Sequence, residues 1–257
     1  MPEIYYQPQG REVELFLAAH KLKMSVLLKG PTGCGKTRFV ESVAQKLGLN
    51  LITVSCHEET SATDLVGRHL LMGSETVFVD GPLTRAVRQG AILYLDEVAE
   101  ARPDVLVVLH SITDYRRQLF IERTGETLVA PDSFMVTASF NPGYQKGLKE
   151  LKPSTRQRFV SIPFSYPLPG PEAEIVAHES GLDLKMVKHL IQIATQIRNL
   201  KELGLMETVS TRLIIDAAKL IGAGIEPRVA CKTAIIEPLT DEEEDRVALT
   251  DLISMQF

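Results

Sequence analysis

Several features that would assign the chain to a specialised class of protein are missing from its sequence. Its three cysteines, Cys34, Cys56 and Cys231, show no paired spacing, which argues against a disulfide framework and predicts reduced thiols in a cytosolic protein. No apolar run approaches the roughly 18 residues of a transmembrane helix, and the N-terminus lacks the basic and apolar regions of a signal peptide. The formal net charge of −5 argues against a general nucleic-acid binder, although a local basic patch is compatible with it.

Metal-ligand spacing is missing as well. The histidines do not recur at the intervals typical of metal ligands, and the neighbouring pair Cys56–His57 is not spaced for chelation. We therefore predict that these side chains are structural or lie at the surface. The histidines concerned are His57, His69, His110, His178 and His189.

The length and composition allow a sizeable core. At 257 residues, of which 44% are hydrophobic, the chain suits one large domain or two smaller ones. The clearest boundary is Pro163–Pro171, where four prolines in nine residues cannot continue a helix or a central strand. We predict an α/β domain over residues 1–167 and a small helical domain over residues 168–257.

The apolar spacing predicts the main elements. Buried strands are expected at 26–28, 51–55, 92–95 and 134–139, and β-hairpins at 70–79 and 116–129. A helix is expected over 104–114, and beyond the boundary further helices over 172–180, 184–201, 210–221 and 228–236. The acidic run 241–245 is typical of a solvated helix start.

Residues 30–37, Gly-Pro-Thr-Gly-Cys-Gly-Lys-Thr, carry the strongest motif. They fit the phosphate-binding pattern G-x-x-x-x-G-K-[ST], between an apolar strand and a segment of helical spacing. Glycines let backbone N–H groups turn toward one point, and a helix N-terminus attracts anionic phosphate. We expect Lys36 to reach the β- and γ-phosphates of a nucleotide and the Thr37 hydroxyl to bind Mg²⁺. The alternative, a glycine turn with a chance lysine, leaves the strand–loop–helix context unexplained.

A second motif lies at the end of the apolar strand 92–95. This strand is followed by two adjacent carboxylates, Asp96 and Glu97. In phosphate-loop enzymes the aspartate at this position supports Mg²⁺, and we assign that role to Asp96. Glu97 would then polarise the attacking water as general base. A strand that merely ends in surface acids is the alternative, and the upstream phosphate loop disfavours it.

Three further polar residues fit two interpretations each. Asn141 follows the predicted strand 134–139, where a polar group can orient water, but an asparagine before proline is also a common turn former. Arg156 and Arg158 fit either surface charge or an arginine finger that reaches a neighbouring subunit's nucleotide. Local residue type alone does not decide between these interpretations.

The order of a nucleotide-binding α/β domain and a small helical domain resembles the AAA+ ATPases. Segments 80–88 and 90–97 resemble the MoxR clade, and both predicted hairpins fall where that clade carries inserts. Segments 30–41, 141–145, 152–159 and 237–241 resemble the CbbQ/NorQ/NirQ group, so that the match covers nearly the whole chain. The resemblance implies an AAA+ P-loop core, with a parallel sheet between helices and two β-hairpin inserts, followed by an all-α lid domain.

The resemblance also implies roles that the local pattern leaves open. Asn141 corresponds to sensor 1, and Arg212 falls where sensor 2 contacts the γ-phosphate. Arg158 is expected to act as the finger in trans, with Arg156 as the alternative, and a homohexameric ring follows because the nucleotide then lies between subunits. The implied ATP-binding residues, of which Thr37 and Asp96 hold Mg²⁺, are Gly30, Pro31, Thr32, Gly33, Cys34, Gly35, Lys36, Thr37, Arg38 and Asp96.

Members of this group remodel client enzymes together with a larger CbbO-like partner that carries a von Willebrand factor A domain. CbbQ-like members reactivate inhibited rubisco by driving release of tight-binding sugar phosphates. NorQ- and NirQ-like members help nitric oxide reductase to mature, including its metal insertion. The resemblance favours a rubisco activase motor, cytoplasmic or associated with carboxysomes, and keeps the nitric oxide reductase chaperone as the alternative.

Two other functional classes stay open. A nucleotide-switched scaffold would bind ATP but barely hydrolyse it; Glu97 and Asn141 argue against this class, because a pure switch needs neither. A DNA-remodelling AAA+ protein is disfavoured by the acidic charge balance and by the lack of a helix-turn-helix extension. The ATPase motifs identify neither the client nor the hairpin that contacts a partner.

Overall fold

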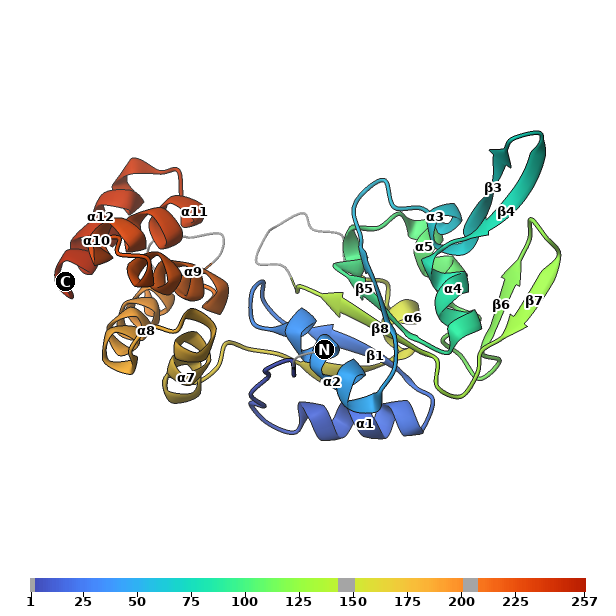
Figure 1. Cartoon of the computed structure of the whole chain (residues 1–257), viewed down its shortest axis with the longest axis horizontal. Helices are drawn as coiled ribbons and strands as arrows, with labels where there is room; N and C mark the ends of the chain where they lie inside the picture. Colours follow the sequence, from blue (N-terminus) through green and yellow to red (C-terminus); the bar gives the residue numbers. More distant parts are fainter. Residues whose placement is uncertain (1–2, 143–150, 201–207) are drawn as a thin grey trace. The chain divides into compact units, whose positions relative to one another are not determined.

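The computed structural model describes residues 3–142, 151–200 and 208–257, which form two compact units (Figure 1). Described residues 3–30, 36–142 and 151–164 make up the first unit. The second consists of residues 31–35, 165–200 and 208–257. Along these residues, no helix has both the length and the apolar character needed to cross a membrane.

A five-stranded parallel sheet organises the first unit (Figure 1). Its strand order is β2–β5–β8–β1–β9. The three central strands are almost wholly buried, as expected for a parallel sheet that is covered on both faces. The strands are β1 (Ser25–Lys29), β2 (Leu51–Ser55), β5 (Ile92–Asp96), β8 (Met135–Phe140) and β9 (Phe159–Pro163).

Alternate residues of each strand pack against different helices. Ile92 and Tyr94 of β5 share a core with α1 (Glu12–Lys21) and α2 (Lys36–Leu47). Leu93 and Leu95 lie in a second core with α3 (Ala62–Val66), α4 (Pro82–Gln89) and α5 (Pro103–Leu109). Since successive side chains of a strand point to opposite faces, this division produces a three-layer arrangement. Two short helices, η1 (Val98–Glu100) and α6 (Pro153–Arg156), complete the unit.

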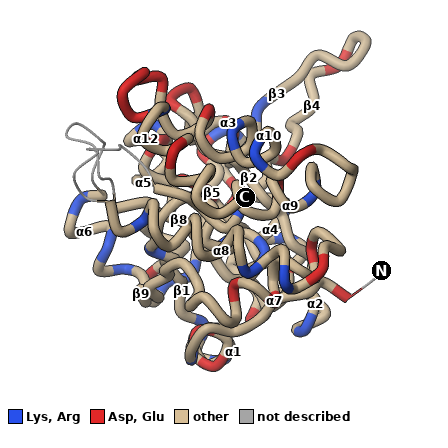
Figure 2. The backbone as a smooth tube through the Cα atoms, turned by 90° about the vertical axis from the view of Figure 1, so that its left-hand side faces the viewer, with Lys and Arg blue, Asp and Glu red and all other residues tan. Residues whose placement is uncertain are grey.

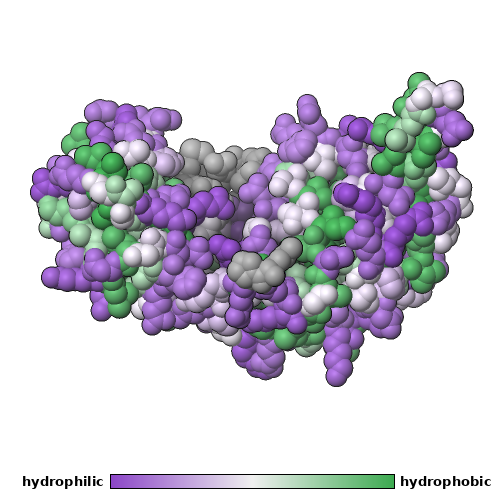
Figure 3. Space-filling view, viewed as in Figure 1, coloured by the Kyte–Doolittle hydropathy of each residue, from purple (hydrophilic) through white to green (hydrophobic). Residues whose placement is uncertain are grey.

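Both predicted hairpins are confirmed. β3 (Gly67–Met72) pairs with β4 (Glu75–Asp80), and β6 (Gln118–Ile121) pairs with β7 (Glu126–Val129), each in antiparallel register. The first hairpin carries exposed apolar side chains, including Leu71 and Met72 near its turn. Figure 3 shows this apolar surface on the projecting hairpin at the upper right.

Some helix boundaries differ from the prediction. The helix expected over 104–114 ends at Leu109, and the Thr113 hydroxyl donates to the Leu109 carbonyl at 2.7 Å. The Thr113 N–H donates to the same carbonyl at 3.0 Å, so one further helical hydrogen bond forms beyond the end of α5. Helix α7 begins at Pro169 rather than residue 172, because proline is tolerated in a first turn, where its missing N–H has no intrahelical partner.

The second unit is helical and has its own core. A bulge interrupts its helical segment 227–239: the Glu237 N–H bonds to the Lys232 carbonyl, five residues earlier. The bulge directly precedes Pro238, which cannot donate to the ladder, and wider turns are a known response to such a break. The elements are α7 (Pro169–Ser180), α8 (Leu184–Asn199), α9 (Thr211–Gly222), α10 (Pro227–Cys231), η3 (Lys232–Ile236), α11 (Glu237–Leu239) and α12 (Glu243–Ser254).

A buried ion pair connects three helices of this unit. Glu172 of α7 is fully buried and accepts two hydrogen bonds from Arg198 of α8, at 2.7 and 2.8 Å. The Thr211 hydroxyl, at the start of α9, donates to the same carboxylate at 2.6 Å.

By contrast, the acidic first turn of α12 is solvated as predicted, and its charges suit a helix N-terminus (Figure 2).

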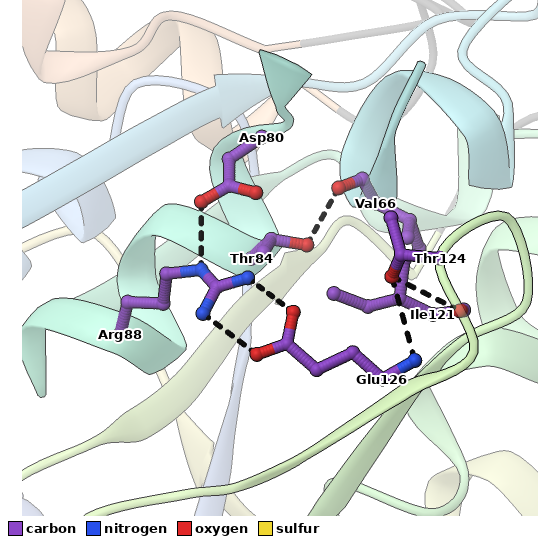
Figure 4. Close-up of polar contacts among 7 residues, drawn as sticks. All are labelled: Val66, Asp80, Thr84, Arg88, Ile121, Thr124 and Glu126. Atoms are coloured by element: carbon purple, nitrogen blue, oxygen red, sulfur yellow. Dashed lines mark hydrogen bonds and ion pairs between the residues drawn. The ribbon is translucent and has the colours of Figure 1, made fainter. Parts of the chain in front are cut away.

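In the first unit, Arg88 of α4 connects the two hairpins (Figure 4). Its Nε donates to Asp80 of β4 at 2.8 Å, and its two Nη atoms donate to both carboxylate oxygens of Glu126 in β7 at 2.9 and 2.5 Å. The hydrogen bonds to Glu126 and then Asp80 raise the pKa of Arg88, and that to Arg88 lowers the pKa of Glu126. The Thr84 hydroxyl donates to the Val66 carbonyl at 2.5 Å and fixes the same helix against the start of the first hairpin.

We expect Arg88→Ala to loosen both hairpins together. Since this change removes the ion pairs to Asp80 and Glu126, backbone amides of both hairpins should exchange about two- to fivefold faster. Hydrogen exchange measured by mass spectrometry tests this. Arg85→Ala is the matched control, because Arg85 lies on the same helix, is exposed and forms no ion pair with a described residue. Equal exchange in the two variants would contradict the linking role.

Candidate nucleotide-binding site

The candidate site lies where β1, β5 and β8 end. These strands are parallel, and Ala138 of β8 is in register with both Leu27 of β1 and Leu95 of β5. Their carboxyl ends therefore meet at one edge of the sheet, the usual place for ligands in open α/β folds. The Gly30 N–H, at the end of β1, donates to the Phe140 carbonyl of β8 at 3.2 Å, which joins the start of the loop to the neighbouring strand.

The loop after β1 requires glycine at its start. A Cβ atom on Gly30 would lie 2.5 Å from the Phe164 carbonyl oxygen, so any other residue would displace the backbone there. Gly35 has φ +95°, a conformation that side chains rarely adopt. Lys36, the first residue of α2, is buried, and its Nζ donates to the Gly30 carbonyl at 2.8 Å. A buried ammonium group beside a helix N-terminus can hold an anionic phosphate.

Four oxygen-bearing side chains meet beyond the loop. Thr37 Oγ1 lies 3.4 Å from Asp96 Oδ2, so that a hydroxyl and a carboxylate oxygen face each other. The other carboxylate oxygen, Asp96 Oδ1, accepts hydrogen bonds from the Tyr94 hydroxyl at 2.7 Å and from Ser139 Oγ at 2.5 Å. Hard cations such as Mg²⁺ prefer oxygen ligands, and the pair formed by Thr37 and Asp96 fits this requirement.

Glu97 follows Asp96 in an unusual backbone conformation. Its φ of 54° and ψ of 47° are left-handed, and its N–H donates to Ser139 Oγ at 2.8 Å. The Glu97 side chain is exposed. Had β5 continued in extended form, Glu97 would point to the face that Leu93 and Leu95 fill. The left-handed turn therefore directs the carboxylate out of the core.

Three more predicted residues, Asn141, Arg156 and Arg158, lie at different places in the first unit. Asn141 directly follows β8, at the same edge as Asp96; residues 143–145 of its motif lie outside the described residues. Arg156 ends α6, and Arg158 lies beside His110 and Asp114 on a different part of the first unit. Burial and then the charge of Arg158 lower the pKa of His110.

Two further predicted cations, Arg212 and Arg38, are exposed on helices. Arg212 is the second residue of α9 in the second unit and is exposed, and Ser210 caps that helix. Arg38 is exposed on α2 and lies 4.0 Å from Glu41, one turn further along. The predicted residues that lie together in the first unit are therefore Lys36, Thr37, Asp96, Glu97 and Asn141.

Sequence reasoning missed Tyr94 and Ser139. Both are fully buried, and both contact Asp96 directly. A signal for Tyr94 was present, because a residue two positions before Asp96 lies on the same face of the strand. Ser139 has the same spacing from Asn141, but its contact with Asp96 depends on the register between two strands.

The thiol next to the site is protected. Burial first, and then the charges of Asp96 and Glu97, raise the pKa of Cys56 to about 12. Burial raises the pKa of Cys231 to about 12 as well, and all three cysteines are buried and form no disulfide within the described residues. Within the described ranges, no three His, Cys, Asp or Glu side chains gather as a metal site.

Two family models match the chain. The model described as AAA domain (dynein-related subfamily) matches residues 25–159, and the one described as CbbQ/NirQ/NorQ C-terminal matches residues 172–256. Protein NorQ of Paracoccus denitrificans is 57% identical over 98% of this chain and 94% of that protein. Denitrification regulatory protein NirQ of Pseudomonas aeruginosa is 52% identical over 98% and 96%. Protein CbbQ of Hydrogenophilus thermoluteolus is 52% identical over 96% and 92%.

Solved structures share the fold at low identity. A putative ATPase from Cytophaga hutchinsonii has a TM-score of 0.53 and 18% identity, covering 96% of this chain and 90% of that chain. A RuvB variant from Thermotoga maritima has a TM-score of 0.57 and 17% identity, covering 96% of this chain and 73% of that one. Together these matches confirm the predicted AAA+ P-loop core, with a helical region after it.

The raised pKa values predict unreactive thiols in the native protein. In a Cys34→Ser background at pH 8, Cys56 and Cys231 should react with a thiolate-specific reagent roughly a thousandfold more slowly than an ordinary thiol. Unfolding in guanidinium should release two reactive thiols per chain. Absorbance with a disulfide reagent measures both phases, and rapid labelling of the native variant would contradict the burial of these groups.

Proposed function

Because the chain belongs to the CbbQ/NirQ/NorQ family of AAA+ ATPases, we propose that it hydrolyses Mg²⁺-bound ATP at the edge where β1, β5 and β8 end, and so remodels a client enzyme. The observation that carries this proposal is the approach of Thr37 Oγ1 to Asp96 Oδ2 at 3.4 Å, with Lys36 and Glu97 adjacent in sequence. Hydroxyl and carboxylate oxygens near a buried ammonium group suit a nucleotide phosphate with its cation.

The chemistry divides among five residues. Lys36 neutralises charge on the β- and γ-phosphates, and the oxygens of Thr37 and Asp96 hold Mg²⁺. Glu97 accepts a proton from the water that attacks the γ-phosphorus, the bond to the β-phosphate breaks, and ADP and phosphate result. Asn141 acts as sensor 1 and orients that water. The role of each residue is part of the proposal.

Two arginines complete the proposed site. Arg212 contacts the γ-phosphate from a lid domain over residues 168–257, while residues 1–167 bind the rest of the nucleotide. Arg158 acts in trans on the nucleotide of a neighbouring subunit, with Arg156 as the alternative, and this requires a ring that we propose to be hexameric. The separate core of the helical unit supports this division of the chain.

The proposed partner is a protein with a von Willebrand factor A domain, and the proposed clients are rubisco and nitric oxide reductase. Sequence identity does not favour rubisco over nitric oxide reductase as the client, since NorQ is 57% identical to this chain and NirQ and CbbQ are 52% identical. Nitric oxide reductase is therefore supported as the client at least as well as rubisco. A cytoplasmic location, with carboxysome association if rubisco is the client, belongs to the same proposal.

Glu97→Gln tests the catalytic assignment. The amide keeps the shape of the side chain but cannot accept the proton, so ATP hydrolysis should fall at least about 100-fold while ATP binding is kept. Phosphate release and nucleotide titration measure the two quantities. Hydrolysis at the wild-type rate would remove Glu97 as general base. A wild-type protein that binds Mg²⁺-ATP without hydrolysing it, with its partners present, would favour the switched scaffold.

The same variant can identify the client. Glu97→Gln held with ATP in the native host should retain the partner and client through affinity purification. Rubisco subunits with a von Willebrand factor A protein would support the activase role, and nitric oxide reductase subunits would support the maturation role. Recovery of neither from an assembly that has bound ATP would contradict both client assignments.

Mixed rings test the finger in trans. Arg158→Ala and Glu97→Gln should each be inactive alone, but mixing them should restore a fraction of the activity. Sites of Arg158→Ala subunits then receive an intact arginine from a Glu97→Gln neighbour. Arg156→Ala is the comparison, and restoration with that variant instead would assign the finger to Arg156. Absence of restoration with either, in rings shown to be mixed, would contradict action in trans.

A further inference from the structure

Resting on the ATP hydrolysis proposed above, we infer that Ser139 and Tyr94 are positioning residues for that reaction: they fix the Asp96 carboxylate, and Ser139 also fixes the backbone of Glu97. Neither side chain belongs to the phosphate loop or to the acidic pair. Both lie in the first unit, on strands β8 and β5.

The two oxygens of Asp96 have different surroundings. Oδ1 accepts from two hydroxyls, those of Tyr94 at 2.7 Å and Ser139 at 2.5 Å, whereas Oδ2 faces Thr37 Oγ1. Two donors on one oxygen stop the carboxylate from rotating about its bond to the chain. The remaining oxygen is thereby directed to the place where Thr37 supplies a second oxygen ligand.

Ser139 contacts both acidic residues through a single oxygen. Its hydroxyl proton goes to Asp96 Oδ1, and its lone pair accepts the Glu97 N–H at 2.8 Å. A serine hydroxyl has one proton to donate and lone pairs to accept, so both bonds form at once. The bond to Glu97 holds the residue in its left-handed conformation, which directs its carboxylate out of the core. One hydroxyl thus couples the positions of the cation-binding acid and the general base.

Tyr94 connects the same carboxylate to helix α2. Its ring is fully buried among residues of α1 and α2, and its hydroxyl lies 3.4 Å from Thr37 Oγ1 as well as in contact with Asp96. The strand that ends in Asp96 and the helix that begins at Lys36 are therefore held in one arrangement by a side chain between them.

A buried hydroxyl on β8 does not require a hydrogen-bond partner, as Thr137 shows. It lies on β8 two residues before Ser139 and is equally buried, yet its Oγ1 has no hydrogen-bond partner among the described residues. The strand therefore tolerates a buried hydroxyl without a partner. Thr137→Val, which keeps the shape and removes the hydroxyl, is accordingly a matched control for Ser139→Ala.

The experiment compares Ser139→Ala, Tyr94→Phe and Thr137→Val with the wild type. ATP affinity is measured in EDTA and over a range of Mg²⁺ concentrations, each variant also being prepared in the Glu97→Gln background to prevent hydrolysis. We expect Ser139→Ala and Tyr94→Phe to need about 10-fold more Mg²⁺ for the tight binding state, with unchanged affinity in EDTA, since outer contacts of metal ligands typically contribute 10- to 100-fold. Thr137→Val should match the wild type.

The rate of ATP turnover distinguishes the role of the Ser139 hydroxyl from that of the Tyr94 hydroxyl. Ser139→Ala should also lower kcat about 10- to 100-fold at saturating Mg²⁺ and ATP, because it releases Glu97, whereas Tyr94→Phe should regain most of its kcat at high Mg²⁺. Should Ser139→Ala fail to fold, as judged by thermal unfolding, the Mg²⁺ shift of Tyr94→Phe still tests the inference. Variants that behave like Thr137→Val would overturn it while leaving wild-type hydrolysis intact. A wild type that does not hydrolyse ATP would overturn the proposed function instead, and the binding measurements would still test how Asp96 is held.

Discussion

The parallel pairing of β8 with both β1 and β5 is the constraint on which the first unit depends. This pairing brings the carboxyl ends of three strands to one edge, where Asp96 ends β5, Asn141 follows β8, and the loop after β1 leads to Thr37. The buried residues on both faces of these strands fix the register, because a shift by one residue would turn the apolar side chains away from their helices. The hydrogen bonds of Ser139 to Asp96 and Glu97 exist only in this register.

The sequence alone predicted those parts of the fold and of the site that are built from residues close together in the chain. The phosphate loop and the pair Asp96–Glu97 are contiguous motifs, and the hairpins follow from apolar arms around a short polar turn. The contacts of Ser139 could not be predicted, because a serine in an apolar strand is ordinary and its partners on the neighbouring strand are set by the sheet register. The contact of Tyr94 with Asp96 was open to prediction, since the two residues lie two positions apart on one face of β5. The end of α5 at Leu109 could not be predicted from the apolar spacing, because that spacing continues to the buried Ile112.

In the helical unit, a comparable constraint is electrostatic. Glu172 is fully buried, and its charge is balanced by Arg198 and by the Thr211 hydroxyl, so that α7, α8 and the start of α9 have one favourable arrangement. Removing one partner of a buried pair is costly because the other charge is left without compensation. The placement of the first turn of α9, which carries Arg212, against α7 and α8 thus depends on a carboxylate that sequence reasoning had treated only as part of a helix.

The left-handed backbone of Glu97 has a consequence for how this protein can change. A residue with a Cβ atom in that conformation costs about 1–2 kcal/mol, whereas glycine adopts it freely and asparagine does so more readily than most residues. Selection for thermal stability alone would therefore favour loss of the carboxylate at position 97, and selection for turnover would restore it. Thermostable lineages and engineered variants of this fold are consequently expected to gain their stability elsewhere in the chain and to retain this local strain.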